Sequence, residues 1–118
     1  MNLHQLSFLG DAVFELLVRD YLTSKNIVKL NDLQNETINF VSAKKQAFFL
    51  KELIDNNKLT EEELDLIRRG RNIKTHKSPK NCDAITYKRS TAFEILIGYL
   101  YKNDKNRLNY IFNEIIKM

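Results

Sequence analysis

The sequence predicts an all-α bundle, and three observations carry that prediction. Apolar residues recur at helical spacing along nearly the whole chain. Residues that favour helix N-caps stand at the starts of several of these periodic segments. The 118 residues contain one proline and three glycines, too few for the many turns of a β-sandwich.

The first half of the chain predicts three helices. A long apolar-rich segment runs from Leu3 to about Ser24 and is the first of them. Either Asn31 or Asp32 is expected to cap a short helix that ends near Phe40. Ser42 is expected to cap the third, which ends near Asp55 and has apolar residues at helical spacing: Ala43, Ala47, Phe48, Leu50, Leu53 and Ile54.

The second half predicts three more helices and one loop. Thr60 and Glu63 form a capping box, and the helix that they open ends near Gly70. Residues 71–82 lack periodicity and contain the only proline, so we expect a loop there. A second long helix follows over residues 83–102, and Asp104 caps a last helix with an apolar face.

Size and composition limit the class of protein. A chain of 118 residues is long enough for one domain, which we assign to residues 1–118. Its single cysteine, Cys82, cannot form an intramolecular disulfide, and no apolar run is long enough to span a membrane. The N-terminal residues lack the pattern of a signal peptide. We therefore expect a cytoplasmic protein without a membrane partner.

Positive charge is concentrated in one segment. The net charge is +4, yet residues 68–89 contain eight basic residues and one acid. Such a local excess predicts contact with a polyanion, and a solvated charged loop is the alternative. The eight candidates for nucleic-acid binding are Arg68, Arg69, Arg71, Lys74, Lys77, Lys80, Lys88 and Arg89.

Two acids stand in matching apolar surroundings. Asp11 lies within "FLGDAVFELLV" and Glu94 within "TAFEILIGYLY", and each has a glycine nearby, Gly10 or Gly98. If the two long helices cross at these glycines, the carboxylates converge. Two carboxylates without a base bind a cation or have raised pKa values, and oxygen ligands alone suit Mg²⁺ or Mn²⁺. Such an ion can promote hydrolysis of a phosphodiester.

A structural role for these acids is the alternative. A lone acid on an apolar helix commonly pairs with a base, for which Arg19, Arg89 and Arg107 are available to Asp11. Glu15 lies one helical turn after Asp11, where it either orients water molecules of a metal at Asp11 or faces solvent or Arg19, and we favour the second interpretation.

Four sequence segments together resemble the catalytic domain of the ribonuclease III family. They are "FLGDAVFELLVRDYL", "VSAKKQA", "RRGRN" and "TYKRSTAFEILIGYLY". The resemblance covers about residues 3–116 and is strongest to Mini-ribonuclease III, the form that consists of the catalytic domain alone. It implies a homodimer that cleaves double-stranded RNA with a divalent metal and leaves 5′-phosphate and 3′-hydroxyl ends. Precursor 23S ribosomal RNA is the implied substrate, and whether a ribosomal protein assists stays open.

The resemblance also implies roles for individual residues. Asp11 and Glu94 match the family's metal ligands, and Phe8 matches the aromatic residue that inserts into the partner subunit. Ser7 and Thr91 stand where full-length ribonuclease III has two further acids. Their hydroxyl groups can hold a water molecule of the metal but bring no charge, a sparse pattern that Mini-ribonuclease III shares.

Two other functions are compatible with the same residues. The missing acids at Ser7 and Thr91 suit a ribonuclease III-like module that binds RNA on the ribosome and has lost catalysis. A purely structural α-helical dimerisation domain is a third possibility, and the clustered basic residues argue against it.

Overall fold

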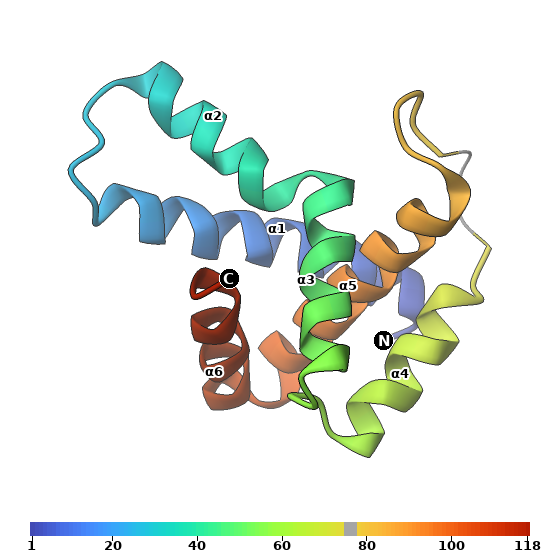
Figure 1. Ribbon diagram of the computed structural model, residues 1–118. Coiled ribbons are helices and arrows are strands. Elements are labelled where there is room, and N and C mark those ends of the chain that lie inside the picture. Colours follow the sequence, from blue (N-terminus) through green and yellow to red (C-terminus); the bar gives the residue numbers. More distant parts are fainter. Residues whose placement is uncertain (75–77) are drawn as a thin grey trace.

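The computed structural model describes residues 1–74 and 78–118, and within them it contains six helices (Figure 1). All regular elements of this part of the chain are helical, so the predicted all-α class is confirmed. None of these helices combines the length and the hydrophobicity that a membrane-spanning helix needs. The helices are α1 (Leu3–Thr23), α2 (Leu30–Val41), α3 (Ala43–Asp55), α4 (Glu61–Arg71), α5 (Ala84–Asn103) and α6 (Lys105–Ile116).

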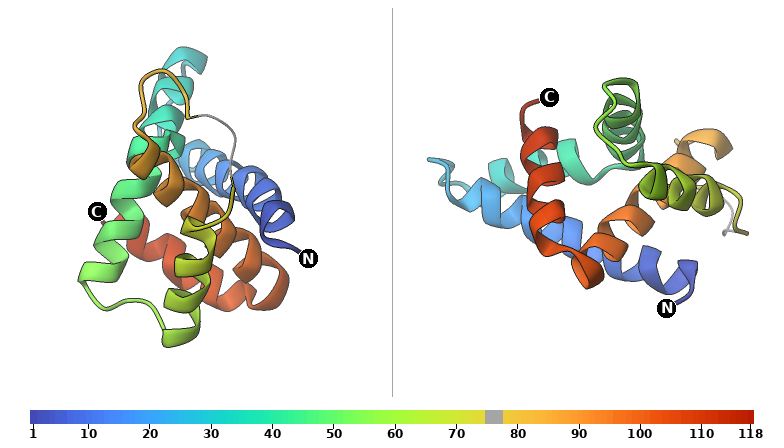
Figure 2. Two further views of the ribbon diagram at one scale, coloured as in Figure 1. Left: turned by 90° about the vertical axis from the view of Figure 1, so that its right-hand side faces the viewer. Right: turned by 90° about the horizontal axis from the view of Figure 1, so that it is seen from below.

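Helix α5 forms the centre of the bundle, where α1, α3, α4 and α6 pack around it (Figure 2). Its side chains are buried on almost every side, which explains why its sequence is apolar around most of the circumference. The largest core cluster surrounds Phe14 of α1 and Phe93 of α5, whose ring centroids are 4.9 Å apart in an edge-to-face arrangement. The two long helices thus build the core together.

Three of the predicted cap residues cap helices as expected. Ser42, Thr60 and Asp104 each accept a hydrogen bond from a backbone N–H in the first turn of the following helix, and Asp83, at the start of α5, does the same. The capping box of Thr60 and Glu63 is present. Each of these side chains satisfies a donor that the helix itself leaves unpaired.

Helix α2, Phe48 of α3 and Gly70 of α4 differ from the sequence prediction. The N-cap of α2 is Lys29, without a side-chain cap bond, so a cap at Asn31 or Asp32 is wrong. In α3 the residue that enters the core is Phe49, whereas Phe48 is 43% exposed. Gly70 lies inside α4, where an added Cβ would approach Ile95 Cδ1 to 2.9 Å. It allows α4 to pack closely on α5 and does not end the helix.

Candidate active site

Helices α1 and α5 cross at two glycines, as the sequence predicted. A Cβ atom added to Gly10 would lie 1.8 Å from the carbonyl oxygen of Glu94. One added to Gly98 would lie 2.2 Å from the carbonyl oxygen of Leu6. Any side chain at either position would push the backbones apart, so both glycines are required for this contact. The crossing places Asp11 and Glu94 next to one another.

The two carboxylates have different environments. Glu94 is half-buried, and burial is the largest cause that raises its pKa to about 8. The negative charge of Asp11 and a hydrogen bond with it raise the pKa further. Asp11 itself is exposed, so the expectation that its apolar sequence neighbours enclose it is wrong. Those neighbours lie on other sides of α1, and Glu94 is the more buried of the two acids.

The polar side chains of Ser7 and Gln46 lower the pKa of Glu94. The Ser7 hydroxyl donates to Glu94 Oε1 over 3.3 Å. A side-chain hydrogen bond with Gln46 of α3 also lowers the pKa of Glu94, but both donors together do not offset burial and Asp11. Gln46 was missed in the sequence analysis. It could have been noticed as a polar residue at a helical position that points into the core with Ala47, Leu50 and Leu53.

The bases proposed to compensate Asp11 are placed elsewhere. Arg19 forms an ion pair with Glu15 over 2.7 Å, as we interpreted for Glu15. Arg107 is hydrogen-bonded to Glu63, with an Nη2–Oε1 distance of 2.8 Å. In the part of the chain that the structure describes, neither Asp11 nor Glu94 takes part in an ion pair. The pair therefore holds negative charge that no cation among the described residues neutralises by an ion pair.

This uncompensated pair has the chemistry of a divalent cation site. Both ligands would be carboxylate oxygens, the donors that Mg²⁺ and Mn²⁺ prefer. Among the described residues, no group of three or more His, Cys, Asp or Glu side chains is placed to hold a metal ion. Two carboxylates and water are sufficient for Mg²⁺, which usually keeps several waters at phosphate-processing sites.

A cleft beside Glu94 offers space for a substrate. It has a volume of about 540 Å³ and opens to solvent. Lys74 is the one RNA-binding candidate within the described part of the chain that lines it. Thr91 is buried at its wall, where its hydroxyl donates to the carbonyl oxygen of Tyr87 over 3.0 Å. The lining residues are His4, Ser7, Phe8, Lys74, Tyr87, Thr91 and Glu94.

The predicted basic segment is divided between several places. Arg68 and Arg69 both pair with Asp65 on their own helix, which partly neutralises them. Arg71 and Arg89 line a separate hollow with Lys51 and Asp55.

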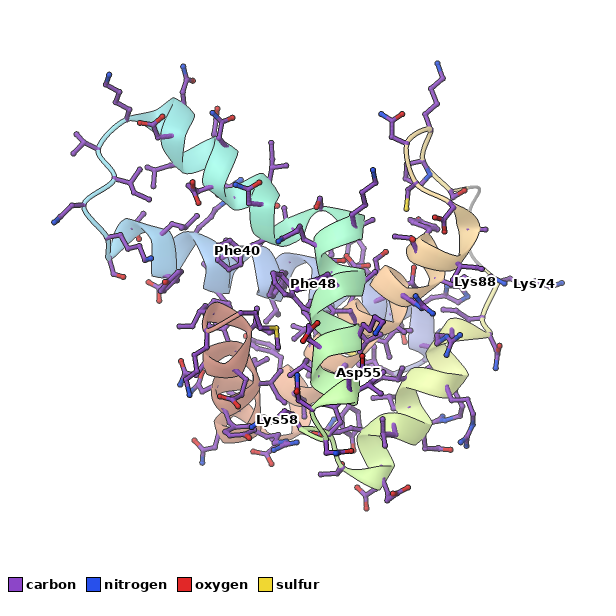
Figure 3. All side chains as sticks on the ribbon, in the orientation of Figure 1. Phe40, Phe48, Asp55, Lys58, Lys74 and Lys88 are labelled. Atoms are coloured by element: carbon purple, nitrogen blue, oxygen red, sulfur yellow. The ribbon has the colours of Figure 1, made fainter. Side chains whose placement is uncertain are left out.

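The remaining basic candidates lie on the side of the α4–α5 connection or outside the described residues. Lys74 and Lys88 extend from that side, whereas Lys58 lies at the opposite end beside α6 (Figure 3). Lys80 and Lys88 are exposed. Lys77 lies outside the described residues.

An apolar surface on α1 lies next to the cleft. Phe8 is 85% exposed, and Leu16, two turns further along the helix, is 66% exposed. Exposed aromatic and aliphatic side chains on one helix face are typical of interaction surfaces. The prediction that Phe8 contacts a partner subunit is compatible with this exposure.

Comparison with known families gives one match that spans most of the chain. The model of the "Ribonuclease III domain" matches residues 4–105. This range includes both glycines of the helix crossing and both carboxylates.

Individual relatives and a solved structure agree with that match. A protein of Enterococcus faecalis named Mini-ribonuclease 3 is 42% identical over 95% of this chain and 86% of its own length. One of the same name from Staphylococcus aureus is 41% identical over 98% of this chain and 87% of its own length. An X-ray crystal structure of a Fusobacterium nucleatum protein superimposes with a TM-score of 0.85, at 32% identity, over 96% of this chain and 91% of that one.

Proposed function

This chain belongs to the ribonuclease III domain family of RNA endonucleases, and from that premise we propose that it cleaves double-stranded RNA in a Mg²⁺-dependent reaction at Asp11 and Glu94. The observation that carries the proposal is the pair of neighbouring carboxylates at the α1–α5 crossing, with which no base in residues 1–74 and 78–118 forms an ion pair. Mn²⁺ is the alternative ion for the same oxygen ligands.

The residues of the site have separable roles in this proposal. Asp11 and Glu94 would hold the ion, which when bound supplies a nucleophile from water at neutral pH and neutralises charge on the phosphodiester. Ser7 orients the Glu94 carboxylate by its hydrogen bond. Lys74, at the wall of the cleft, is placed to attract an RNA phosphate. Release of the 3′ oxygen leaves 5′-phosphate and 3′-hydroxyl ends.

Recognition of the substrate rests on the same domain. Proteins contact double-stranded RNA mainly by shape, phosphate and 2′-hydroxyl contacts, so base-specific side chains are not required. The predicted basic residues would provide phosphate contacts whose strength falls with salt. The relatives named Mini-ribonuclease 3 support a ribonuclease activity. We propose maturation of precursor 23S ribosomal RNA in the cytoplasm, with or without a ribosomal protein, as the cellular reaction.

Removal of either carboxylate tests the proposal. We expect Asp11→Asn and Glu94→Gln each to lower the rate of cleavage of a precursor ribosomal RNA stem by 1,000-fold or more (on the order of 4 kcal/mol). Asp20→Asn, an exposed acid on the same helix, is the matched control and should cleave normally. Gel mapping of both cut ends measures rate and product chemistry together.

Two results would contradict the catalytic assignment. Full activity of either variant would remove that residue from the site. Salt-sensitive binding of the RNA stem by the wild type without cleavage in Mg²⁺, and unchanged by EDTA, would favour the non-catalytic RNA-binding module. The hydroxyls at Ser7 and Thr91, where two further acids are missing, keep that second function open to test.

We also propose that two copies pair through the exposed apolar face of α1. Phe8 is 85% exposed, and burial of such a side chain at an interface is worth about 2 kcal/mol or more. Phe8→Glu is therefore expected to give monomers in sedimentation at concentrations where the wild type is dimeric. Val28→Glu, at an equally exposed apolar position, is the control and should not change the mass. A Phe8→Glu protein that remains dimeric would place the interface elsewhere.

A further inference from the structure

A small hollow lies on a different side of α5 from the carboxylate pair. Helices α3 and α4 both pack against α5 (Figure 1), and the hollow opens between them with a volume of about 220 Å³. Among the described residues, none lines both this hollow and the cleft beside Glu94. Arg89, at its wall, precedes Glu94 by five residues, which places the two about 140° apart around the helix axis. The lining residues are Leu50, Lys51, Ile54, Asp55, Arg71 and Arg89.

The hollow holds more positive than negative charge. Lys51 of α3 pairs with Asp55 one turn later, with an Nζ–Oδ2 distance of 2.5 Å, so these two charges largely neutralise each other. Arg71, in the last turn of α4, and Arg89 of α5 take part in no ion pair within the described residues. The three residues outside that part, 75–77, include no acid. Two guanidinium groups therefore line one hollow without a carboxylate of their own.

The surroundings of these cations favour an anion. Arg89 is half-buried, and the wall that it shares with Leu50 is apolar, since Leu50 is 1% exposed. The hydrogen bond and the negative charge of Asp55 raise the pKa of Lys51, and the positive charge of Arg89 acts in the opposite direction. An anion in the hollow would relieve this repulsion between like charges.

Two guanidinium groups are suited to a phosphate group. Each presents a planar fork of N–H donors that can contact two phosphate oxygens at once. A phosphate dianion balances two cations, whereas a single carboxylate balances one. The volume of about 220 Å³ is below the roughly 300–1,000 Å³ that is typical of sites for whole drug-sized ligands. The hollow therefore fits a phosphate group better than a complete nucleotide.

We propose that this hollow binds a phosphate group through Arg71 and Arg89, at a site separate from the cleavage centre. The group belongs to a free phosphate ion or to an RNA backbone, and its chemistry is the same in both. The ion pair with Asp55 keeps Lys51 from the anion and so limits the affinity. The hollow would bind phosphate whether or not Asp11 and Glu94 hold a metal ion.

Titration with inorganic phosphate in EDTA, followed by NMR, tests this site without cleavage. We expect Arg71→Gln and Arg89→Gln each to bind phosphate about tenfold more weakly than the wild type, because each loses a charge-assisted contact. Asp55→Asn should bind it about two- to fivefold more tightly, since it removes a negative charge and releases Lys51. Lys102→Gln, at an exposed base of α5, changes the net charge equally and should bind like the wild type.

Binding of an RNA stem in EDTA identifies the source of the phosphate. If Arg71→Gln and Arg89→Gln weaken RNA binding more than Lys102→Gln does, the group belongs to the RNA backbone. Weaker phosphate binding with unchanged RNA affinity assigns the site to a free anion.

One result of these titrations overturns the proposal. It is a wild type that binds neither inorganic phosphate nor the RNA stem more tightly than the arginine variants do. Arg71 is exposed, so Arg71→Gln supplies the comparison if Arg89→Gln does not fold. Neither titration depends on cleavage, so this result would leave the assignment of Asp11 and Glu94 intact.

Discussion

Two glutamates in this bundle have lost much of their contact with water, and their pKa values are shifted in opposite directions. Glu63 of α4 is 5% exposed and Glu94 of α5 is half-buried. Burial raises the pKa of Glu63, but hydrogen bonds with Arg107 and Thr60 outweigh it and leave the pKa below its ordinary value. Burial and Asp11 instead raise the pKa of Glu94 to about 8. The difference separates an acid that is paired within the fold from one that we propose binds a cation.

The arrangement around Glu63 shows what full compensation requires. Arg107 Nε donates to Glu63 Oε2 over 2.9 Å, and its Nη2 donates to Glu63 Oε1 and to the carbonyl oxygen of Lys58. The backbone N–H of Thr60 donates to the same carboxylate over 2.9 Å. Both carboxylate oxygens thus have charged or backbone donors. Among the described residues, the groups that lower the pKa of Glu94 are the neutral side chains of Ser7 and Gln46, although the chain contains 19 basic residues.

The largest effect on stability is expected at the compensated glutamate. Arg107→Met leaves the Glu63 charge buried without its partner, and loss of one member of such a pair costs roughly 3–5 kcal/mol. Urea unfolding measures the loss, with Lys102→Met, at an exposed base, as the control. Below its melting temperature the variant should cleave RNA normally. A stability like that of the control would show that Glu63 and Arg107 contribute little to the fold.

A double variant sharpens this comparison. Glu63→Gln/Arg107→Met removes both charges, and it should be more stable than Arg107→Met alone because no unpaired charge is left. If the double variant is instead the less stable of the two, the penalty in Arg107→Met comes from lost packing of the arginine side chain.

Much of this architecture follows from local sequence, and the exceptions share one physical cause. Caps such as Ser42 and Asp104 act within one turn, and the role of Gly10 and Gly98 followed from the cost of glycine inside a helix. The pairing of Glu63 with Arg107 joins residues 44 positions apart. No periodicity indicates such a contact before the helices are packed.

The candidate site divides in the same way. The sequence predicted the convergence of Asp11 and Glu94, because a glycine marked each segment. It did not predict that Asp11 is exposed while Glu94 is half-buried, because this difference depends on the rotation of each helix about its axis. It also did not reveal Gln46, since that contact requires the relative placement of α3 and α5. Long-range packing decides these features.

The next prediction compares how the stability contributions of Glu94 and Glu63 depend on pH in metal-free protein. The folded state raises the pKa of Glu94, so this residue contributes stability at low pH that is lost as the pH rises through about 8. We expect Glu94→Gln to exceed the wild type in free energy of unfolding by roughly 2–3 kcal/mol at pH 8.5 in EDTA, and by little at pH 4.5. Urea unfolding at both values measures the difference.

The opposite sign is expected at Glu63, whose pKa is lowered in the folded state. The contribution of Glu63 to stability is present above the ordinary pKa of a glutamate and is lost as the pH falls.

Saturating Mg²⁺ is the control for the Glu94 prediction. At pH 8.5 it should remove the stability advantage of Glu94→Gln, because the ion stabilises only the wild type. Equal stability of both proteins at pH 8.5 in EDTA would mean that Glu94 is compensated by a group other than those described.

The smallest effect is expected at Glu15, which lies one turn from Asp11 on α1. Its ion pair with Arg19 is solvent-exposed on both sides, and such pairs contribute about 0.3–0.5 kcal/mol. Glu15→Gln also removes repulsion of a few tenths of a kcal/mol from Asp11, so the two changes nearly cancel. We expect unchanged urea unfolding and an unchanged Mg²⁺ requirement for cleavage. A clear rise in the Mg²⁺ concentration for half-maximal cleavage would make Glu15 a third acid of the site, and the ion pair with Arg19 would then have to open when metal binds.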